Sequence, residues 1–167
     1  MDNVALNGGN RRRETDLGIR RVLIVDDIHE IQSTLRRVFR MARVEEIVTA
    51  SNIDEARTQL EVATKARQPF DIVFMDQMMP GGTGTELLEE VVARGNSFVD
   101  RRFTGFFILS GVTEPGFREK AKAAGAIDVM QKPFSAEQLL QYGRKWIQFR
   151  SRAQSKPNPE DGAQEQA

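Results

Sequence analysis

"FDIVFMDQMMPGG", residues 70–82, sets a short apolar run directly against a carboxylate. The run from Ile72 to Met75 is typical of a strand that is buried on both faces of a sheet. Asp76 follows at once, and Pro80 with two glycines then interrupts the strand pattern. A charge at the end of a buried strand costs free energy unless other groups compensate it. The stretch therefore predicts a strand whose last residue requires partners from elsewhere in the chain.

Strand and helix patterns alternate on both sides of this stretch. Five short apolar runs are each followed by a segment with apolar residues at helical spacing, and capping residues such as Asn52 and the Ser135–Gln138 pair mark helix starts. Pro115 is expected in the first turn of the fourth helix. Strict alternation predicts a doubly wound α/β fold, a five-stranded parallel sheet of (βα)5 type with no further elements. The strands are expected at 21–27, 44–50, 71–75, 106–110 and 126–130, and the helices at 28–39, 51–67, 84–95, 113–125 and 135–150.

Composition limits the kinds of function. The chain has 167 residues, with 24 Lys and Arg against 24 Asp and Glu, so it lacks the basic excess expected of a nucleic-acid binder. Cysteine is absent, which excludes disulfides and thiolate metal sites. There is neither an apolar run of membrane-spanning length nor a secretory signal pattern, so a cytoplasmic protein without membrane insertion is expected. We expect a flexible arm at 1–18, one folded domain at 19–151 and a disordered tail at 152–167.

Polar residues follow four of the five predicted strands. Asp26 and Asp27 end the first strand, Asp76 the third and Ser110 the fourth, while Lys132 follows the fifth. In parallel sheets of this kind ligands bind at the carboxyl ends of the strands, so these side chains are expected on one rim. Three neighbouring carboxylates repel unless a cation joins them, and hard oxygen ligands suit Mg²⁺. Lysine and serine could then hold a tetrahedral anion, with Asp76 acting either as a phosphoryl acceptor or as one more metal ligand.

The order of these segments resembles the receiver domain of two-component response regulators, and the resemblance covers roughly residues 20–150. It implies a flavodoxin-like fold. It also implies a Mg²⁺ site in which Asp27 is a direct ligand, Asp26 holds a metal-bound water, and Asp76 and the backbone carbonyl of Met78 complete the set. The segments that carry the resemblance are "VLIVDD" (22–27), "DIVFMDQMMPGGTG" (71–84), "ILSG" (108–111) and "VMQKPF" (129–134).

The same resemblance implies roles in phosphoryl transfer. Asp76 would be the phospho-acceptor, Ser110 the switch hydroxyl, and Lys132 the ammonium paired with the acceptor, with a cis peptide before Pro133. Val129 occupies the place where many relatives carry a switching aromatic residue, so output through an aromatic rotamer there is not expected.

Apolar residues stand two positions after the acceptor and two after the switch serine. In the family that the chain resembles, these two places often influence how the attacking water is positioned. Here they hold Met78 and Val112, which can neither orient nor attract water, so slow hydrolysis of the phosphorylated form is expected.

Other conspicuous residues have simpler interpretations. Phe106 and Phe107 are expected in the core, and His29 is expected to be an exposed loop residue. The segment 94–105 reads as an enlarged loop whose arginines, Arg94, Arg101 and Arg102, are exposed to solvent. The last helix carries an aromatic stripe that suits core packing or a dimer or partner surface, at Tyr142, Trp146 and Phe149.

These observations favour a stand-alone response regulator. It would take a phosphoryl group from a histidine kinase or histidine phosphotransfer protein, and would then change its affinity for an unknown protein target or pass the group on. Such a protein is a switch that catalyses its own phosphorylation and dephosphorylation rather than a conventional enzyme. Two alternatives stay open: a phosphorylation-independent interaction module, and an aspartate-nucleophile phosphatase of the haloacid-dehalogenase type. The phosphatase needs a second aspartate where Met78 stands. A homodimer also stays open.

Overall fold

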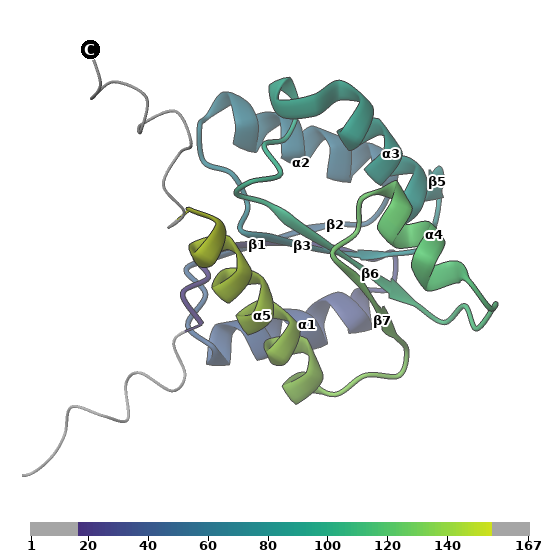
Figure 1. Cartoon of the computed structure of the whole chain (residues 1–167). Helices are drawn as coiled ribbons and strands as arrows, with labels where there is room; N and C mark the ends of the chain where they lie inside the picture. The colour runs from purple at the N-terminus through teal and green to yellow at the C-terminus, as the bar shows by residue number, and fades with distance from the viewer. Residues whose placement is uncertain (1–16, 155–167) are drawn as a thin grey trace, which may run out of the picture.

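The computed structural model describes residues 17–154, and Figure 1 shows a central sheet with helices on both sides. The sheet consists of five strands in the order β2-β1-β3-β6-β7, and every neighbouring pair is parallel. This is the flavodoxin-like order, so the predicted doubly wound fold is confirmed. The strands are β1 (Arg21–Val25), β2 (Glu46–Ala50), β3 (Ile72–Asp76), β6 (Gly105–Ser110) and β7 (Asp128–Gln131).

The helices form two layers that cover opposite faces of the sheet (Figure 1). One core lies under α2 (Ile53–Lys65), α3 (Gly84–Arg94) and α4 (Phe117–Ala124), and the other lies under α1 (His29–Met41) and α5 (Ala136–Gln154). All residues of β3 and β6 are buried, because helices cover both sides of these central strands. Phe106 faces the first core and Phe107 the second, as predicted for core residues.

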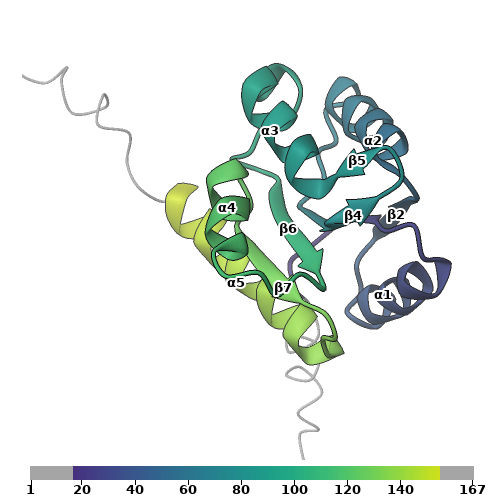
Figure 2. The ribbon, with the colours of Figure 1, turned by 90° about the vertical axis from the view of Figure 1, so that its right-hand side faces the viewer.

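Two small elements depart from strict βα alternation. A two-stranded antiparallel hairpin, β4 (Met78–Met79) with β5 (Gly82–Thr83), follows β3, and Figure 2 shows it beside α3. A 3₁₀ turn, η1 (Gly95–Ser97), follows α3. The prediction of no further elements was therefore wrong. The hairpin forms because Gly81 and Gly82 adopt positive φ angles, which allow a tight reversal directly after the acidic strand end.

The fourth helix begins later than the sequence pattern predicted. Gly116 has φ = 84° and serves as the N-cap, so α4 starts at Phe117 and Pro115 lies before the helix rather than in its first turn. The left-handed conformation of Gly116 is incompatible with a helix interior. Other helix starts match the prediction: Asn52 caps α2, and Ser135 and Gln138 exchange the two hydrogen bonds of a capping box.

The boundaries of the folded part also differ from 19–151. Leu17 is buried, so packing begins before the predicted start of the domain, and α5 continues to Gln154, past the predicted end, although residues 151–153 are exposed. Residues 1–16 of the predicted arm and 155–167 of the predicted tail lie outside the described residues. Within the described part, no helix combines the length and the apolar character needed to cross a membrane.

Arg94, Arg101 and Arg102 are exposed, as predicted, but each also forms specific contacts at the end of α3 or in the loop that follows it. Arg94 forms ion pairs with Glu61 and Glu90 and stacks on the ring of Phe98. Arg101 donates a hydrogen bond to the carbonyl of Gly125, and Arg102 forms an ion pair with Asp100. These partners lie partly on other elements, where no local sequence pattern indicates them.

Two smaller predictions were only partly right. His29 is exposed and stands at the start of α1, as predicted, but it is part of the helix rather than of the preceding loop. The aromatic stripe of α5 divides: Trp146 is buried, Tyr142 is half-buried and Phe149 is 63% exposed.

Candidate functional site

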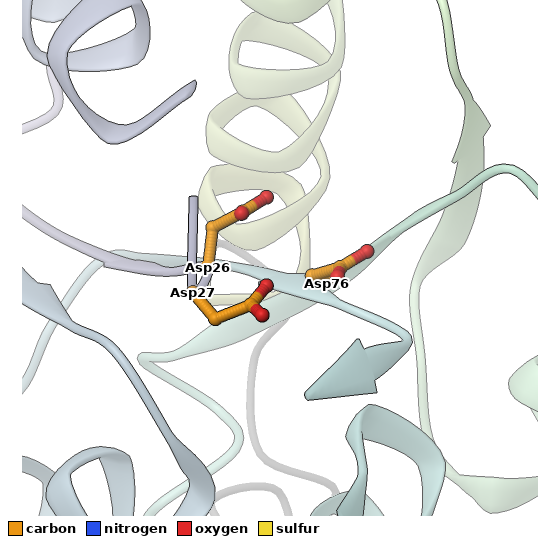
Figure 3. Close-up of side chains that lie close together, drawn as sticks. All are labelled: Asp26, Asp27 and Asp76. Atoms are coloured by element: carbon orange, nitrogen blue, oxygen red, sulfur yellow. The ribbon is translucent and has the colours of Figure 1, made fainter. Parts of the chain in front are cut away.

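Three carboxyl groups meet at the carboxyl edge of the sheet, next to the point where the strand order reverses. Asp26 and Asp27 follow β1, and Asp76 is the last residue of the neighbouring strand β3. One oxygen from each carboxylate lies within 4.8 Å of the others, and Figure 3 shows the three groups gathered above the strand ends. Asp26 is fully buried, Asp76 is 8% exposed and Asp27 is exposed. The predicted acidic cluster is therefore present, open to solvent on the side of Asp27.

Lys132 links the two covered carboxylates. Its Nζ donates to Asp26 Oδ2 at 3.0 Å and to Asp76 Oδ1 at 3.1 Å. Burial alone would lower the pKa of Lys132, but the hydrogen bonds to both carboxylates together outweigh burial and raise that pKa. Burial also raises the pKa of Asp76, and Lys132 opposes this rise only in part. Lys132 therefore carries a full positive charge at neutral pH, between two acids.

The charges of the cluster do not balance within the protein. Among residues 17–154, Lys132 is the only lysine or arginine that pairs with any of the three carboxylates. Full ionisation thus leaves two uncompensated negative charges beside one ammonium. A hard divalent cation with flexible demands on its oxygen ligands fits this donor set, and Mg²⁺ commonly binds through a few carboxylates while keeping several waters.

The other predicted site residues lie on neighbouring strands or loops. Ser110 ends β6 and is buried, and its Oγ accepts a hydrogen bond of 2.9 Å from the Val112 N–H. The Lys132–Pro133 peptide is cis, as predicted. Val129 is buried in β7, with its side chain in the core under α4. The side chain of Met78, in β4, is 63% exposed, so the position two after Asp76 projects an apolar group into solvent.

Two buried amides near the cluster were not predicted. Gln32 of α1 donates to the carbonyl of Asp26, and Gln77, directly after Asp76, exchanges two hydrogen bonds with Thr85. A sequence signal for Gln32 does exist, because it lies in the apolar stripe of helix 28–39, four residues after Ile28 and three before Leu35. A polar residue at a buried helical position needs an internal partner. No comparable signal marks Gln77.

Comparison with known proteins agrees with the geometry. The family model of the response regulator receiver domain matches residues 22–144. The hydrogenase transcriptional regulatory protein HoxA of Cupriavidus necator is 33% identical over 131 residues, which is 76% of this chain and 24% of HoxA. Sporulation initiation phosphotransferase F of Bacillus subtilis is 25% identical, and the match covers 78% of this chain and 96% of that protein.

Among solved structures, chemotaxis protein CheY4 of Vibrio cholerae superimposes with a TM-score of 0.63 at 31% identity, over 76% of this chain and 98% of CheY4. The chain spans less than half of the length of the first curated relatives. The match covers 24% of HoxA and 45% of the transcriptional regulatory protein ResD of Bacillus subtilis. The shared part is in each case the length of one receiver domain. With the parallel sheet and the acidic rim already described, these matches show that the chain belongs to the receiver domain family of the response regulators of two-component signalling.

Proposed function

We propose that this receiver domain accepts a phosphoryl group on Asp76 from a phosphohistidine donor, a histidine kinase or a histidine phosphotransfer protein. The observation that carries the proposal is the position of Asp76: it ends a buried central strand, contacts the ammonium of Lys132 and lies in a cluster of three carboxylates. A carboxylate oxygen at this place can attack phosphorus in line with the departing imidazole. The P–N bond breaks, its electron pair returns to the imidazole, and an acyl phosphate forms on Asp76.

The remaining residues neutralise and hold the transferred group. Lys132 supplies a charge beside the reacting oxygen, and the Ser110 hydroxyl keeps its proton available because Oγ accepts, rather than donates, the bond from Val112. Asp26, Asp27 and Asp76, with the backbone carbonyl of Met78, would hold Mg²⁺. When bound, Mg²⁺ would supply the positive charge that the clustered carboxylates and the phosphoryl oxygens require.

Phosphorylation would then change the affinity for a protein target or be followed by onward transfer. The name sporulation initiation phosphotransferase F supports onward transfer of the phosphoryl group. HoxA and ResD are both named transcriptional regulatory proteins, which supports a switch in a regulatory pathway. Because Val129 is a buried aliphatic residue, the output would not use rotation of an aromatic ring at that position. A phosphatase of the aspartate-nucleophile type is disfavoured, since Met78 has no proton to donate to a leaving group.

The proposal is tested by incubation with acetyl phosphate, with and without Mg²⁺, followed by intact-mass measurement. The wild type should gain about 80 Da, the mass of one phosphoryl group, and only with Mg²⁺. Asp76→Ala should gain nothing. Asp54→Ala is the matched control, because it removes an aspartate whose side chain is 86% exposed on α2, and it should behave as the wild type. Absence of any gain in the wild type would refute the proposal and favour a phosphorylation-independent interaction module.

A further inference from the structure

Gln32 is a buried amide in an otherwise apolar helix face. It lies on α1 between Ile28 and Leu35 and is 6% exposed. Its Nε2 donates to Asp26 O at 2.6 Å and to Ala50 O at 3.1 Å, and lies 3.2 Å from Ser51 Oγ. Two of these partners are carbonyl oxygens, which only accept, so the nitrogen of the amide must face them. The side chain therefore ties α1 to the carboxyl ends of both β1 and β2.

The short bond to the Asp26 carbonyl satisfies a group that the sheet leaves unpaired. The neighbouring carbonyl of Ala50 already accepts a hydrogen bond from the Asp26 N–H at 3.1 Å. This carbonyl therefore has a backbone partner even without Gln32. No backbone hydrogen bond to the Asp26 carbonyl is found among residues 17–154. Since β2 ends at Ala50, no further strand residue is available to supply one. Gln32 thus provides the donor that a longer strand would have provided.

The Asp26 carbonyl belongs to the peptide unit that carries Asp27. The three carboxylates differ in how they are held: Asp26 accepts from the Ile28 N–H and from Lys132, and Asp76 accepts from Lys132. The side chain of Asp27 forms no hydrogen bond or ion pair with any residue from 17 to 154. Its direction toward the other two carboxylates therefore depends on its backbone, and the peptide plane on its N-terminal side is held by Gln32.

We propose that Gln32 is a positioning residue for the acidic cluster: by holding the Asp26–Asp27 peptide, it orients the exposed Asp27 carboxylate for binding of a divalent cation. This inference rests on the proposed function and deepens it. Groups that orient metal ligands from outside the coordination sphere commonly change metal affinity about 10- to 100-fold when removed. A purely structural amide would instead affect stability alone.

The test compares Gln32→Met with Leu35→Ala. Methionine has nearly the length of glutamine but no donor, so the peptide loses its partner with little change in volume. Leu35 is buried one turn further along the same helix, and truncating it weakens the packing of α1 without removing any bond to Asp26. Both substitutions are expected to lower the melting temperature, so thermal melting does not distinguish a positioning role of Gln32 from a purely structural one.

Two measurements are made on each protein: the backbone order parameter of Asp27 by ¹⁵N relaxation without metal, and the dissociation constant for Mg²⁺ by titration of amide shifts. In Gln32→Met we expect a mobile Asp27 and Mg²⁺ binding about tenfold weaker or more. The rate of phosphorylation by acetyl phosphate should recover to nearly the wild-type value once Mg²⁺ is saturating. Leu35→Ala should keep both the order parameter and the dissociation constant of the wild type.

The outcomes separate this inference from the proposed function. An unchanged Asp27 order parameter and an unchanged Mg²⁺ affinity in Gln32→Met, with a wild type that binds Mg²⁺, would overturn the inference alone. Equal losses of Mg²⁺ affinity in Gln32→Met and Leu35→Ala would also overturn it, because the effect would then reflect stability. A wild type that binds no Mg²⁺ would overturn the proposed function, and with it the assignment of Gln32 to a cation site.

Discussion

Gly84 offers a direct test of how tightly the acceptor strand is packed. It is the first residue of α3, and a Cβ placed there would lie 2.7 Å from the backbone oxygen of Asp76 and 3.0 Å from Ile108 Cδ1. The first partner is backbone of a buried strand and cannot rotate away. The helix cannot retreat either, because Gly84 donates its N–H to Gln77 O at 2.9 Å and Thr83 closes a capping box with Glu86. Gly84→Ala must therefore displace the main chain at Asp76.

The expected cost follows from this overlap. Forcing one methyl group into a closely packed site costs about 1–3 kcal/mol. For a folded part of 138 residues, from 17 to 154, that free energy corresponds to a melting temperature lower by roughly 3–10 °C. A shift of a few tenths of an ångström at the acceptor should also slow phosphorylation by acetyl phosphate roughly tenfold. Melting is followed by circular dichroism, and phosphorylation by intact mass.

Gly111 provides the matched control, because it follows Ser110 on the same edge of the sheet. A Cβ there would meet no atom within 4 Å, and its φ is not positive. Gly111→Ala should therefore keep the stability of the wild type or add up to about 1 kcal/mol through the unfolded chain, with no loss of phosphorylation. If Gly84→Ala melts and reacts like Gly111→Ala, the packing argument is wrong.

Three further outcomes are expected. Asp128→Asn should lower the free energy of unfolding by about 0.5–1 kcal/mol at neutral pH. Burial alone would raise the pKa of Asp128, but the hydrogen bonds from Arg118 and from the following backbone N–H outweigh burial and hold that pKa below its ordinary value of 3.8. This contribution is present above that ordinary value and is lost as the pH falls through the lowered pKa, so the melting curves of variant and wild type should converge in acid. The acyl phosphate should persist for minutes or longer because Met78 positions no water, and decay within seconds, seen by mass after removal of the donor, would contradict this expectation. Trp146→Phe should cost about 1–2 kcal/mol through loss of the 2.8 Å bond to Asp71 O, while phosphorylation at the other edge of the sheet stays unchanged.

Local patterns were sufficient to predict the sheet and its functional edge. Each site residue lies within two positions of the end of an apolar run, and parallel strands place their carboxyl ends together, so Asp26, Asp76 and Lys132 could be expected on one rim without knowledge of the packing. Strand order itself does not follow from the alternation of elements. It came from the resemblance carried by four short segments, and the pairing of β1 with both β2 and β3 confirms it.

The errors arose where long-range contacts or backbone conformation decide the structure. A proline is compatible with the first turn of a helix, and that reading took precedence over the turn signal of the Pro115-Gly116 pair, at which Gly116 adopts a left-handed conformation and delays α4. Arg94 and Arg101 have partners on α2 and in the turn after α4, which a scan along the chain cannot pair with them. Gln32 does carry a sequence signal, its place in an apolar stripe, but its acceptors lie at the ends of two strands and no local pattern identifies them.

The two ends of β3 show why burial of an acid does not by itself mark function. Asp71, just before the strand, is nearly buried, but its carboxylate accepts from the N–H groups of Arg20 and Arg21 and pairs with Arg150. The Arg150 guanidinium balances the charge of Asp71, and the three donors satisfy its oxygens, so Asp71 connects the start of β1 and the end part of α5 to the start of β3. Asp76, five residues later, shares a single ammonium with Asp26 and faces Asp27. In the sequence both aspartates flank the same apolar run, and the rule that ligands bind at the carboxyl ends of parallel strands favours Asp76; the structure adds the physical difference between them. The acid with satisfied partners holds the fold together, whereas the acid left with excess negative charge around it is the one to which we assign the cation and the incoming phosphoryl group.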